Sequence, residues 1–78
     1  MSYLRIKKQN GLVEISNSQG MRVMRPTMEA ALTAAMKAAE IASEDDEVIQ
    51  STYNAAQVLD SLVGEDESGQ IGTGVQSA

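Results

Sequence analysis

The first 25 residues consist of short runs in which apolar and polar side chains alternate, separated by turn-forming residues. In "YLRIKKQNGLVEIS" the Asn10-Gly11 pair favours a type I′ turn, because both central residues of that turn need a positive φ. In "NSQG", Gly20 suits the left-handed position of a three-residue loop. We therefore predict a three-stranded antiparallel meander, with strands at about residues 3–9, 12–16 and 21–25.

These turns also predict which residues face each other. The first turn sets Ile6 opposite Ile15, and the second sets Ile15 opposite Met21. Because side chains alternate between the faces of a strand, one face is then apolar and comprises Leu4, Ile6, Val13, Ile15, Met21 and Val23. The outer face comprises Tyr3, Arg5, Lys7, Leu12, Glu14, Arg22 and Met24. On it, Glu14 lies opposite Lys7 and Arg22, and Leu12 lies opposite Met24.

Two helical patterns follow the meander. Pro26 ends the third strand because it cannot donate a backbone hydrogen bond, and Thr27 is a suitable N-cap for a helix at about 28–42. This alanine-rich helix is apolar on most sides and must be covered on most sides. A second, amphipathic helix at about 44–63 is expected to begin after Ser43 and to end at Gly64. Its predicted apolar face comprises Val48, Thr52, Ala55, Ala56, Leu59, Leu62 and Val63.

The last segment, "EDESGQIGTGVQSA", is rich in glycine and acidic residues and poor in apolar ones. Such a composition is typical of chain that stays disordered. We therefore predict one α+β domain at residues 1–63, in which two helices pack on one face of a three-stranded antiparallel meander, and a flexible acidic tail at 64–78.

The composition of the chain argues against several classes of function. The chain has no Cys and no His, so it lacks thiolates, disulfides and the commonest general base. It contains no glycine loop suited to phosphate between a strand and a helix, and so short a chain does not easily build a pocket. We expect a protein that is not an enzyme and binds no cofactor or metal.

The predicted hydrophobic core is small for a protein that is stable as a monomer. There is no Phe or Trp and only two Tyr, so Ile, Leu, Val, Met and Ala must fill the interior. Small domains without disulfides or metals are often stabilised by association. We therefore expect a homo-oligomer, a dimer in the simplest case. No apolar stretch approaches the length of a membrane span or the core of a secretory signal, which favours the cytoplasm of a bacterial or host cell.

An acidic run lies between the two predicted helices, in "EIASEDDEVIQ". Ser43 and Asp46 have the spacing of a capping box, and carboxylates in a first turn interact favourably with the helix dipole. Calcium loops need spaced ligands, and this run does not have that spacing. Besides starting a helix, the acidic run is a candidate contact surface for a basic partner. Its residues are Glu40, Glu44, Asp45, Asp46 and Glu47.

The opposite charge gathers in the strands. Residues 1–26 carry five basic residues and one acidic residue, whereas residues 27–78 carry one basic and ten acidic residues, for a net charge of −5. The exposed sheet therefore offers a second candidate site, for a protein or a nucleic acid. Its residues are Arg5, Lys7, Leu12, Arg22, Met24 and Arg25. The order of three strands and a helix resembles, in topology alone, the arm-binding domains of tyrosine integrases.

Stacking aromatics are nearly absent from this face, where Tyr3 stands alone, and the net charge of −5 opposes nonspecific affinity for phosphates. An apolar patch rimmed by charge, as Leu12 and Met24 would form, often marks a protein contact. We therefore expect a small protein-interaction module, an adaptor or inhibitor that acts by surface complementarity. It suits an accessory protein of a phage or other mobile element that binds a host nucleic-acid-handling protein. A nucleic-acid-binding module that uses the basic sheet face is the alternative.

Overall fold

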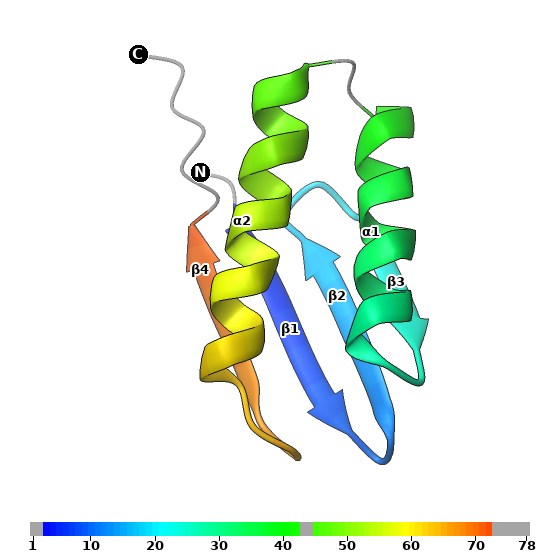
Figure 1. The fold of residues 1–78 in the computed structure, drawn as a ribbon, viewed down its shortest axis with the longest axis vertical. Coiled ribbons are helices and arrows are strands. Elements are labelled where there is room, and N and C mark those ends of the chain that lie inside the picture. Colours follow the sequence, from blue (N-terminus) through cyan, green and yellow to red (C-terminus); the bar gives the residue numbers. More distant parts are fainter. Residues whose placement is uncertain (1–2, 43–44, 73–78) are drawn as a thin grey trace.

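The computed structural model describes residues 3–42 and 45–72, and in them the chain forms an α+β fold of two layers (Figure 1). One layer is a four-stranded antiparallel sheet with the strand order β3-β2-β1-β4, and the other is a pair of helices on one face of that sheet. Helix α1 packs on β2 and β3, and α2 packs on β1 and β4. The elements are β1 (Tyr3–Gln9), β2 (Leu12–Asn17), β3 (Arg22–Arg25), α1 (Met28–Ala42), α2 (Asp46–Leu62) and β4 (Ser68–Gly72).

The first hairpin confirms the prediction from the sequence. Asn10 and Gly11 have φ values of 55° and 74°, as a type I′ turn requires. Ile6 lies opposite Ile15, and Lys7 lies opposite Glu14. The two-residue turn therefore fixes both the register and the face on which each side chain lies.

The second hairpin has a different register from the predicted one. Ile15 lies opposite Val23 rather than Met21, a shift of two residues. The cause is the loop at Ser18–Gly20, which Asn17 closes: its backbone N donates to Met21 O at 3.1 Å, and its Oδ1 accepts from Met21 N at 2.9 Å. Because a shift of two residues preserves the alternation of side chains, the predicted faces survive the error.

The fourth strand corrects the prediction of a three-stranded sheet with a disordered tail. Ser68–Gly72 pairs antiparallel with β1, so that Ile71 lies opposite Leu4 and Gly69 opposite Ile6. Gly69 permits this close packing: a Cβ there would come within 2.7 Å of Val63 Cγ2 and 3.2 Å of Leu59 Cδ2. The rest of the predicted tail, residues 73–78, lies outside the described residues.

The core lies between the sheet and the helices. Leu4, Ile6 and Ile15 are fully buried, and the half-buried Met21 and Val23 pack against them, which confirms the predicted inner face. The helices contribute mostly alanines to this core, which lets them approach the sheet closely. The core side chains of the helical half are Ala31, Ala35, Ala55, Ala56, Leu59 and Val63. Leu62, predicted on the buried face of α2, is instead 71% exposed.

The helix ends follow the capping rules with two differences from the sequence prediction. Thr27 caps α1 as predicted, since its Oγ1 accepts from Ala30 N at 3.1 Å. The N-cap of α2 is Asp45, whose Oδ1 accepts from Glu47 N at 2.9 Å; the predicted cap, Ser43, lies outside the described residues. Helix α2 ends with Val63 as its C-cap rather than with Gly64. No helix in residues 3–42 and 45–72 is long and apolar enough to cross a membrane.

Candidate interaction surfaces

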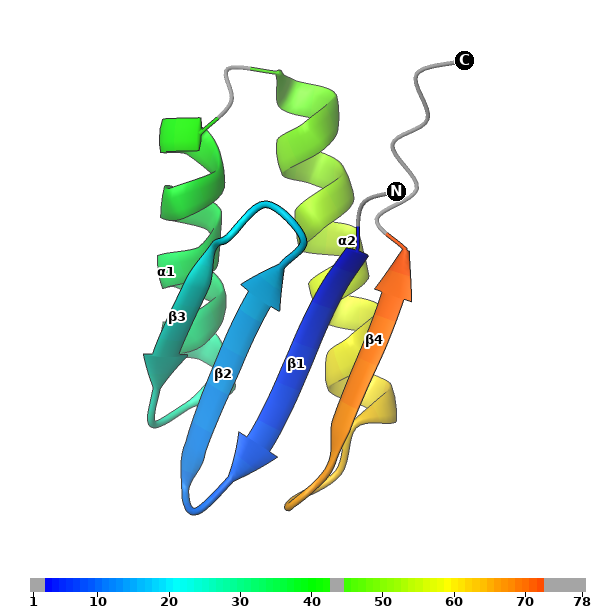
Figure 2. The same cartoon turned by 180° about the vertical axis from the view of Figure 1, so that it is seen from behind.

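The outer face of the sheet is open, because both helices lie on the other face (Figure 2). Among the described strand residues, alternation places Arg5, Lys7 and Arg22 on this face with a single acid, Glu14, which gives these residues a net charge of +2. The whole chain carries −5. The open face is therefore a positively charged surface on an acidic protein.

Two exposed apolar side chains lie among these charges. Leu12 is 40% and Met24 is 41% exposed. They were predicted to lie opposite each other, but the shifted register sets Met24 opposite Glu14, so that Leu12 is its diagonal neighbour. Both line a shallow depression of about 200 Å³, whose rim is formed by Lys7, Gln9, Asn10, Glu14 and Arg22.

Within residues 3–42 and 45–72, the one acid on the open face, Glu14, is held by an arginine. Arg22 Nη2 lies 2.9 Å from Glu14 Oε2, and Arg22 Nε donates to the same oxygen at 3.1 Å. The prediction that Glu14 and Arg22 lie directly opposite each other is wrong, because Arg22 lies opposite Ser16. The long arginine side chain nevertheless reaches diagonally to the carboxylate. In the described part of the chain, Arg5 and Lys7 have no ion-pair partner. Their charges are therefore available to a ligand.

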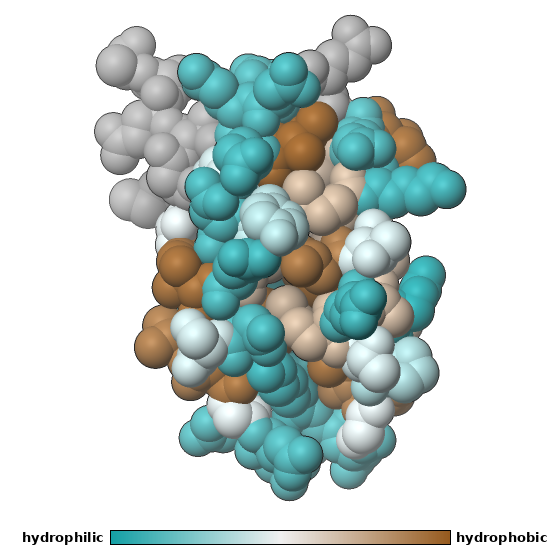
Figure 3. All heavy atoms as spheres, viewed as in Figure 1, coloured by the Kyte–Doolittle hydropathy of each residue, from teal (hydrophilic) through white to brown (hydrophobic). Residues whose placement is uncertain are grey.

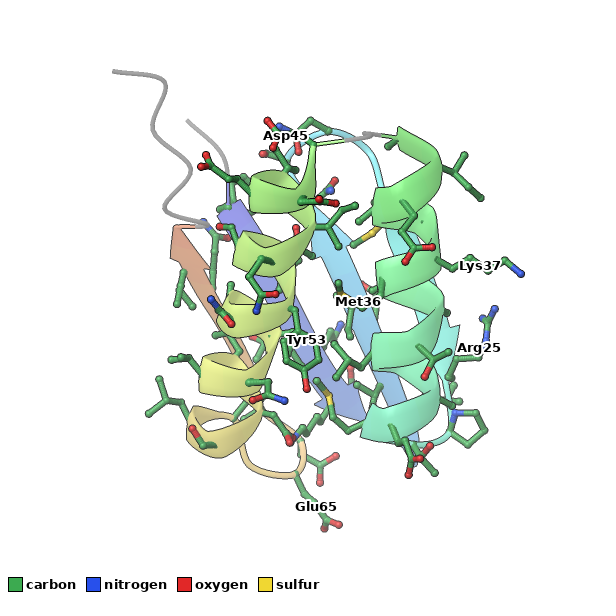
Figure 4. All side chains as sticks on the ribbon, turned by 45° about the horizontal axis from the view of Figure 1, so that its top comes forward. Arg25, Met36, Lys37, Asp45, Tyr53 and Glu65 are labelled. Carbon is green, nitrogen blue, oxygen red and sulfur yellow. The ribbon has the colours of Figure 1, made fainter. Side chains whose placement is uncertain are left out.

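Arg25 does not belong to this face. It lies opposite Val13, a residue of the inner face, and its Nη1 donates to Met24 O at 2.7 Å. In Figure 4 its side chain points from the edge of β3 toward the side of α1. The structure thus brings five of the six predicted residues of the sheet site together and separates Arg25 from them.

The acidic run lies at the junction of the two helices, at the opposite end of the molecule from the Asn10-Gly11 turn (Figures 1 and 4). Asp45 is the N-cap, and Asp46 and Glu47 are exposed in the first turn of α2. Glu40 is exposed near the end of α1, and Glu44 lies outside the described residues. Asp45 caps α2, and the carboxylates of Asp46 and Glu47 interact favourably with the dipole of the helix. The start of a helix is therefore enough to explain why acidic residues occupy these positions.

Sequence reasoning missed a groove between the helices. Met36 of α1 and Tyr53 of α2 point toward the space between the two helices in Figure 4, and half-buried apolar side chains are visible there in Figure 3. The groove has a volume of about 490 Å³, and Leu32, Thr33, Lys37 and Glu40 complete its lining. The signal in the sequence was the alanine-rich first helix, which is apolar on more sides than the sheet can cover.

A second missed surface lies where α2 meets β4. A groove of about 460 Å³ runs there, lined by Glu47, Gln50, Ser51, Asn54, Ala55, Val58, Ile71 and Gly72. Val58 and Leu62, one helical turn apart, are 46% and 71% exposed, and apolar side chains are visible on this side of the molecule in Figure 3. The Ser51 hydroxyl is buried beside this groove without a hydrogen-bond partner in the described structure. The sequence prediction overlooked this surface because it treated residues 64–78 as a tail.

The described residues include no group of three or more acidic, His or Cys side chains that could hold a metal ion. No protein-family model matches the chain. No curated protein and no solved structure matches it either. The fourth strand also separates this topology from the three-stranded order that suggested a resemblance to integrase arm-binding domains.

Proposed function

We propose that this chain is a small non-enzymatic protein-interaction module, an adaptor or inhibitor whose binding site is the open face of the sheet. The observation that carries the proposal is that Leu12 and Met24, both about two-fifths exposed, line one depression whose rim includes the basic side chains of Lys7 and Arg22. An exposed apolar patch with a charged rim is typical of a protein contact.

The charges of the open face indicate which kind of partner surface would bind to it. Arg22 neutralises Glu14, which leaves Arg5 and Lys7 to attract opposite charge. A partner surface with one or two apolar side chains surrounded by carboxylates would complement both features. The acidic helix junction of a second copy is a poor candidate, because the two −5 chains repel each other at a distance.

Nucleic acid is the alternative ligand, and the face supports it less well. Only Tyr3 offers an aromatic ring for stacking, and single-strand binders usually combine several such rings with basic residues. Leu12 and Met24 would contribute little to phosphate contacts, which depend on positive charge. The proposals of a cytoplasmic location and of a phage or mobile-element origin stay predictions from size and composition.

Two double variants separate these functions. Leu12→Ser with Met24→Ser removes the apolar patch and keeps every charge, whereas Arg5→Ser with Lys7→Ser removes charge and keeps the patch. We expect a protein partner, captured by the wild-type chain from its native host and identified by mass spectrometry, to be lost from both variants. Ile41→Ser is the matched control, because Ile41 is 81% exposed on α1, away from the sheet face.

Nucleic-acid binding would give a different pattern. In gel shifts with DNA and RNA, the alternative requires binding that weakens steeply with salt, that is lost in the Arg5 and Lys7 variant, and that persists in the Leu12 and Met24 variant. The proposed function would be overturned by that pattern if, in addition, no protein captured by the wild-type chain were lost from the variant that carries Leu12→Ser and Met24→Ser.

A further inference from the structure

The two edges of the sheet are unequal. Strand β3 is four residues long, carries Arg22 and Arg25 and is followed by Pro26, all of which discourage pairing with another strand. Strand β4, at the other edge, has the sequence "SGQIG", with no charge and no proline. Edges without such protection are ready templates for another strand. Strand β4 is therefore the edge that can accept one.

The hydrogen bonds of β4 show which backbone groups are available. Lys8 N donates to Glu67 O at 2.8 Å, and the pairing then continues through Lys7 with Ser68. In an antiparallel ladder, hydrogen-bonded and non-hydrogen-bonded pairs alternate. Gly69 and Ile71 therefore direct their backbone groups toward β1, and the other three residues of the strand direct theirs toward the open edge. These are Ser68, Gln70 and Gly72.

We propose that two copies of this chain associate by antiparallel pairing of β4 with β4 of the second copy, around a two-fold axis at Gln70. Ser68 then lies opposite the second copy's Gly72, and about six backbone hydrogen bonds form between the outward-facing groups. The two four-stranded sheets become one continuous sheet. The second copy is the simplest partner for such an edge, since a two-fold contact presents the same surface twice.

The side chains of β4 fit this pairing. On the helix side, Gly69 lies opposite Ile71 of the second copy, so that the isoleucine meets a position without a side chain. On the outer side, the two Gln70 amides lie opposite each other and can exchange hydrogen bonds. The pairing places no like charges side by side, since β4 carries none.

The adjoining side of α2 extends the contact. Val58 and Leu62 are exposed there, and Ile71 is half-buried in the same groove. From Ser51 to Leu62, the α2 residues on this side carry no charge, and Glu47 is the one charged residue among the described residues that line the groove. Two chains of charge −5 repel each other, so a contact between them is favoured where few charges lie. This surface meets that condition, whereas the sheet face and the helix junction do not.

The pairing has a consequence for the proposed function. A two-fold axis perpendicular to the sheet places the open faces of both copies on the same side of the continuous sheet. If the sheet face binds a partner, the dimer binds two, and a bivalent partner is held more tightly than by either site alone. The association itself does not depend on the proposed function.

Sedimentation equilibrium tests the association. We expect a mass that rises with concentration to twice the 8.3 kDa of one chain, and an association that does not weaken at high salt, because salt screens the repulsion between the copies. Val58→Glu places a carboxylate near the axis on an exposed position of a helix and should weaken the association at least tenfold. A mass of one chain at every concentration up to the millimolar range would overturn the proposal.

A cysteine cross-link tests the geometry. The chain has no Cys, so Gln70→Cys introduces a single thiol. A hydrogen-bonded pair on the two-fold axis has a Cα separation of about 5.5 Å, within the range of disulfides. We expect mild oxidation to link Gln70→Cys chains in high yield and to leave the control, Gln57→Cys on the exposed side of α2, mostly unlinked. Equal yields from the two variants, or a dimer that Gln70→Cys does not trap, would overturn the β4 pairing.

Discussion

Lys8 Nζ lies 2.9 Å from Asp60 Oδ1, and this contact joins the first strand to the last turn of the second helix. The same ammonium group donates to Val63 O at 2.9 Å and to Asp60 O at 3.4 Å. Helix α2 has no basic residue in its own last turn. Lys8 therefore supplies from β1 the positive charge that the C-terminus of a helix favours.

Lys8→Met should lower the free energy of unfolding by about 1–2 kcal/mol, because it removes the charge at the helix end and leaves carbonyl groups without a donor. The Lys8 side chain is 19% exposed and that of Asp60 is 47% exposed, so solvent screens part of the ion pair. Urea unfolding measures the change. Lys7→Met, on the open face, is the control and should stay within about 0.5 kcal/mol of wild type. Equal effects from the two variants would contradict the role of Lys8.

Gly69→Val should detach β4 from the fold. The new side chain would collide with Val63 and Leu59, and overpacking of this kind typically costs about 1–3 kcal/mol. Hydrogen exchange should show faster exchange of the Ile71 amide than in wild type, while the amide of Ile15 in β2 stays protected. Ser68→Val, an exposed position on the same strand, should leave the exchange of Ile71 unchanged. If Gly69→Val left the exchange of Ile71 slow, β4 would not pack against α2 as described.

Asp45→Ala should destabilise the protein by about 1 kcal/mol, because the side chain accepts the Glu47 backbone N–H at the start of α2. Asp45→Asn keeps an oxygen acceptor and should recover most of that loss, since asparagine is as good an N-cap as aspartate. Thermal unfolding of both variants measures the difference. Equal losses would show that the charge of Asp45, rather than its cap, stabilises the fold.

Ser51→Ala should leave stability unchanged or raise it by up to about 1 kcal/mol, because it removes a buried hydroxyl that has no hydrogen-bond partner among the described residues and adds a better helix former. The matched control is Ser61→Ala, since the Ser61 hydroxyl is exposed and donates to Val58 O at 2.8 Å. Loss of that solvent-exposed hydrogen bond should change stability by less than about 0.5 kcal/mol. A clear loss of stability in Ser51→Ala, seen by urea unfolding, would mean that its hydroxyl has a partner.

Local chemistry in the sequence determined the first hairpin, the faces of the strands and the two helices. Asn10-Gly11 fixes a turn whose backbone angles few other residue pairs adopt. The alternation of side chains between the two faces of a strand then assigns Ile6 and Ile15 to the core. Thr27 and the alanines after it specify α1 in the same way. The open face with Arg5, Lys7 and Leu12 follows directly from that alternation.

Only the tertiary structure decided β4, the second register and the contact of Lys8 with α2. "SGQIG" has little strand propensity of its own, and it becomes a strand because β1 offers an unpaired edge and Gly69 fits against Val63. The Asn17 side chain bonds across its loop and moves the pairing by two residues, which no hydrophobic pattern reveals. Lys8 and Asp60 are 52 residues apart in the sequence and still form an ion pair. Such long-range contacts depend on how the sheet and the helices pack and not on neighbours in the sequence.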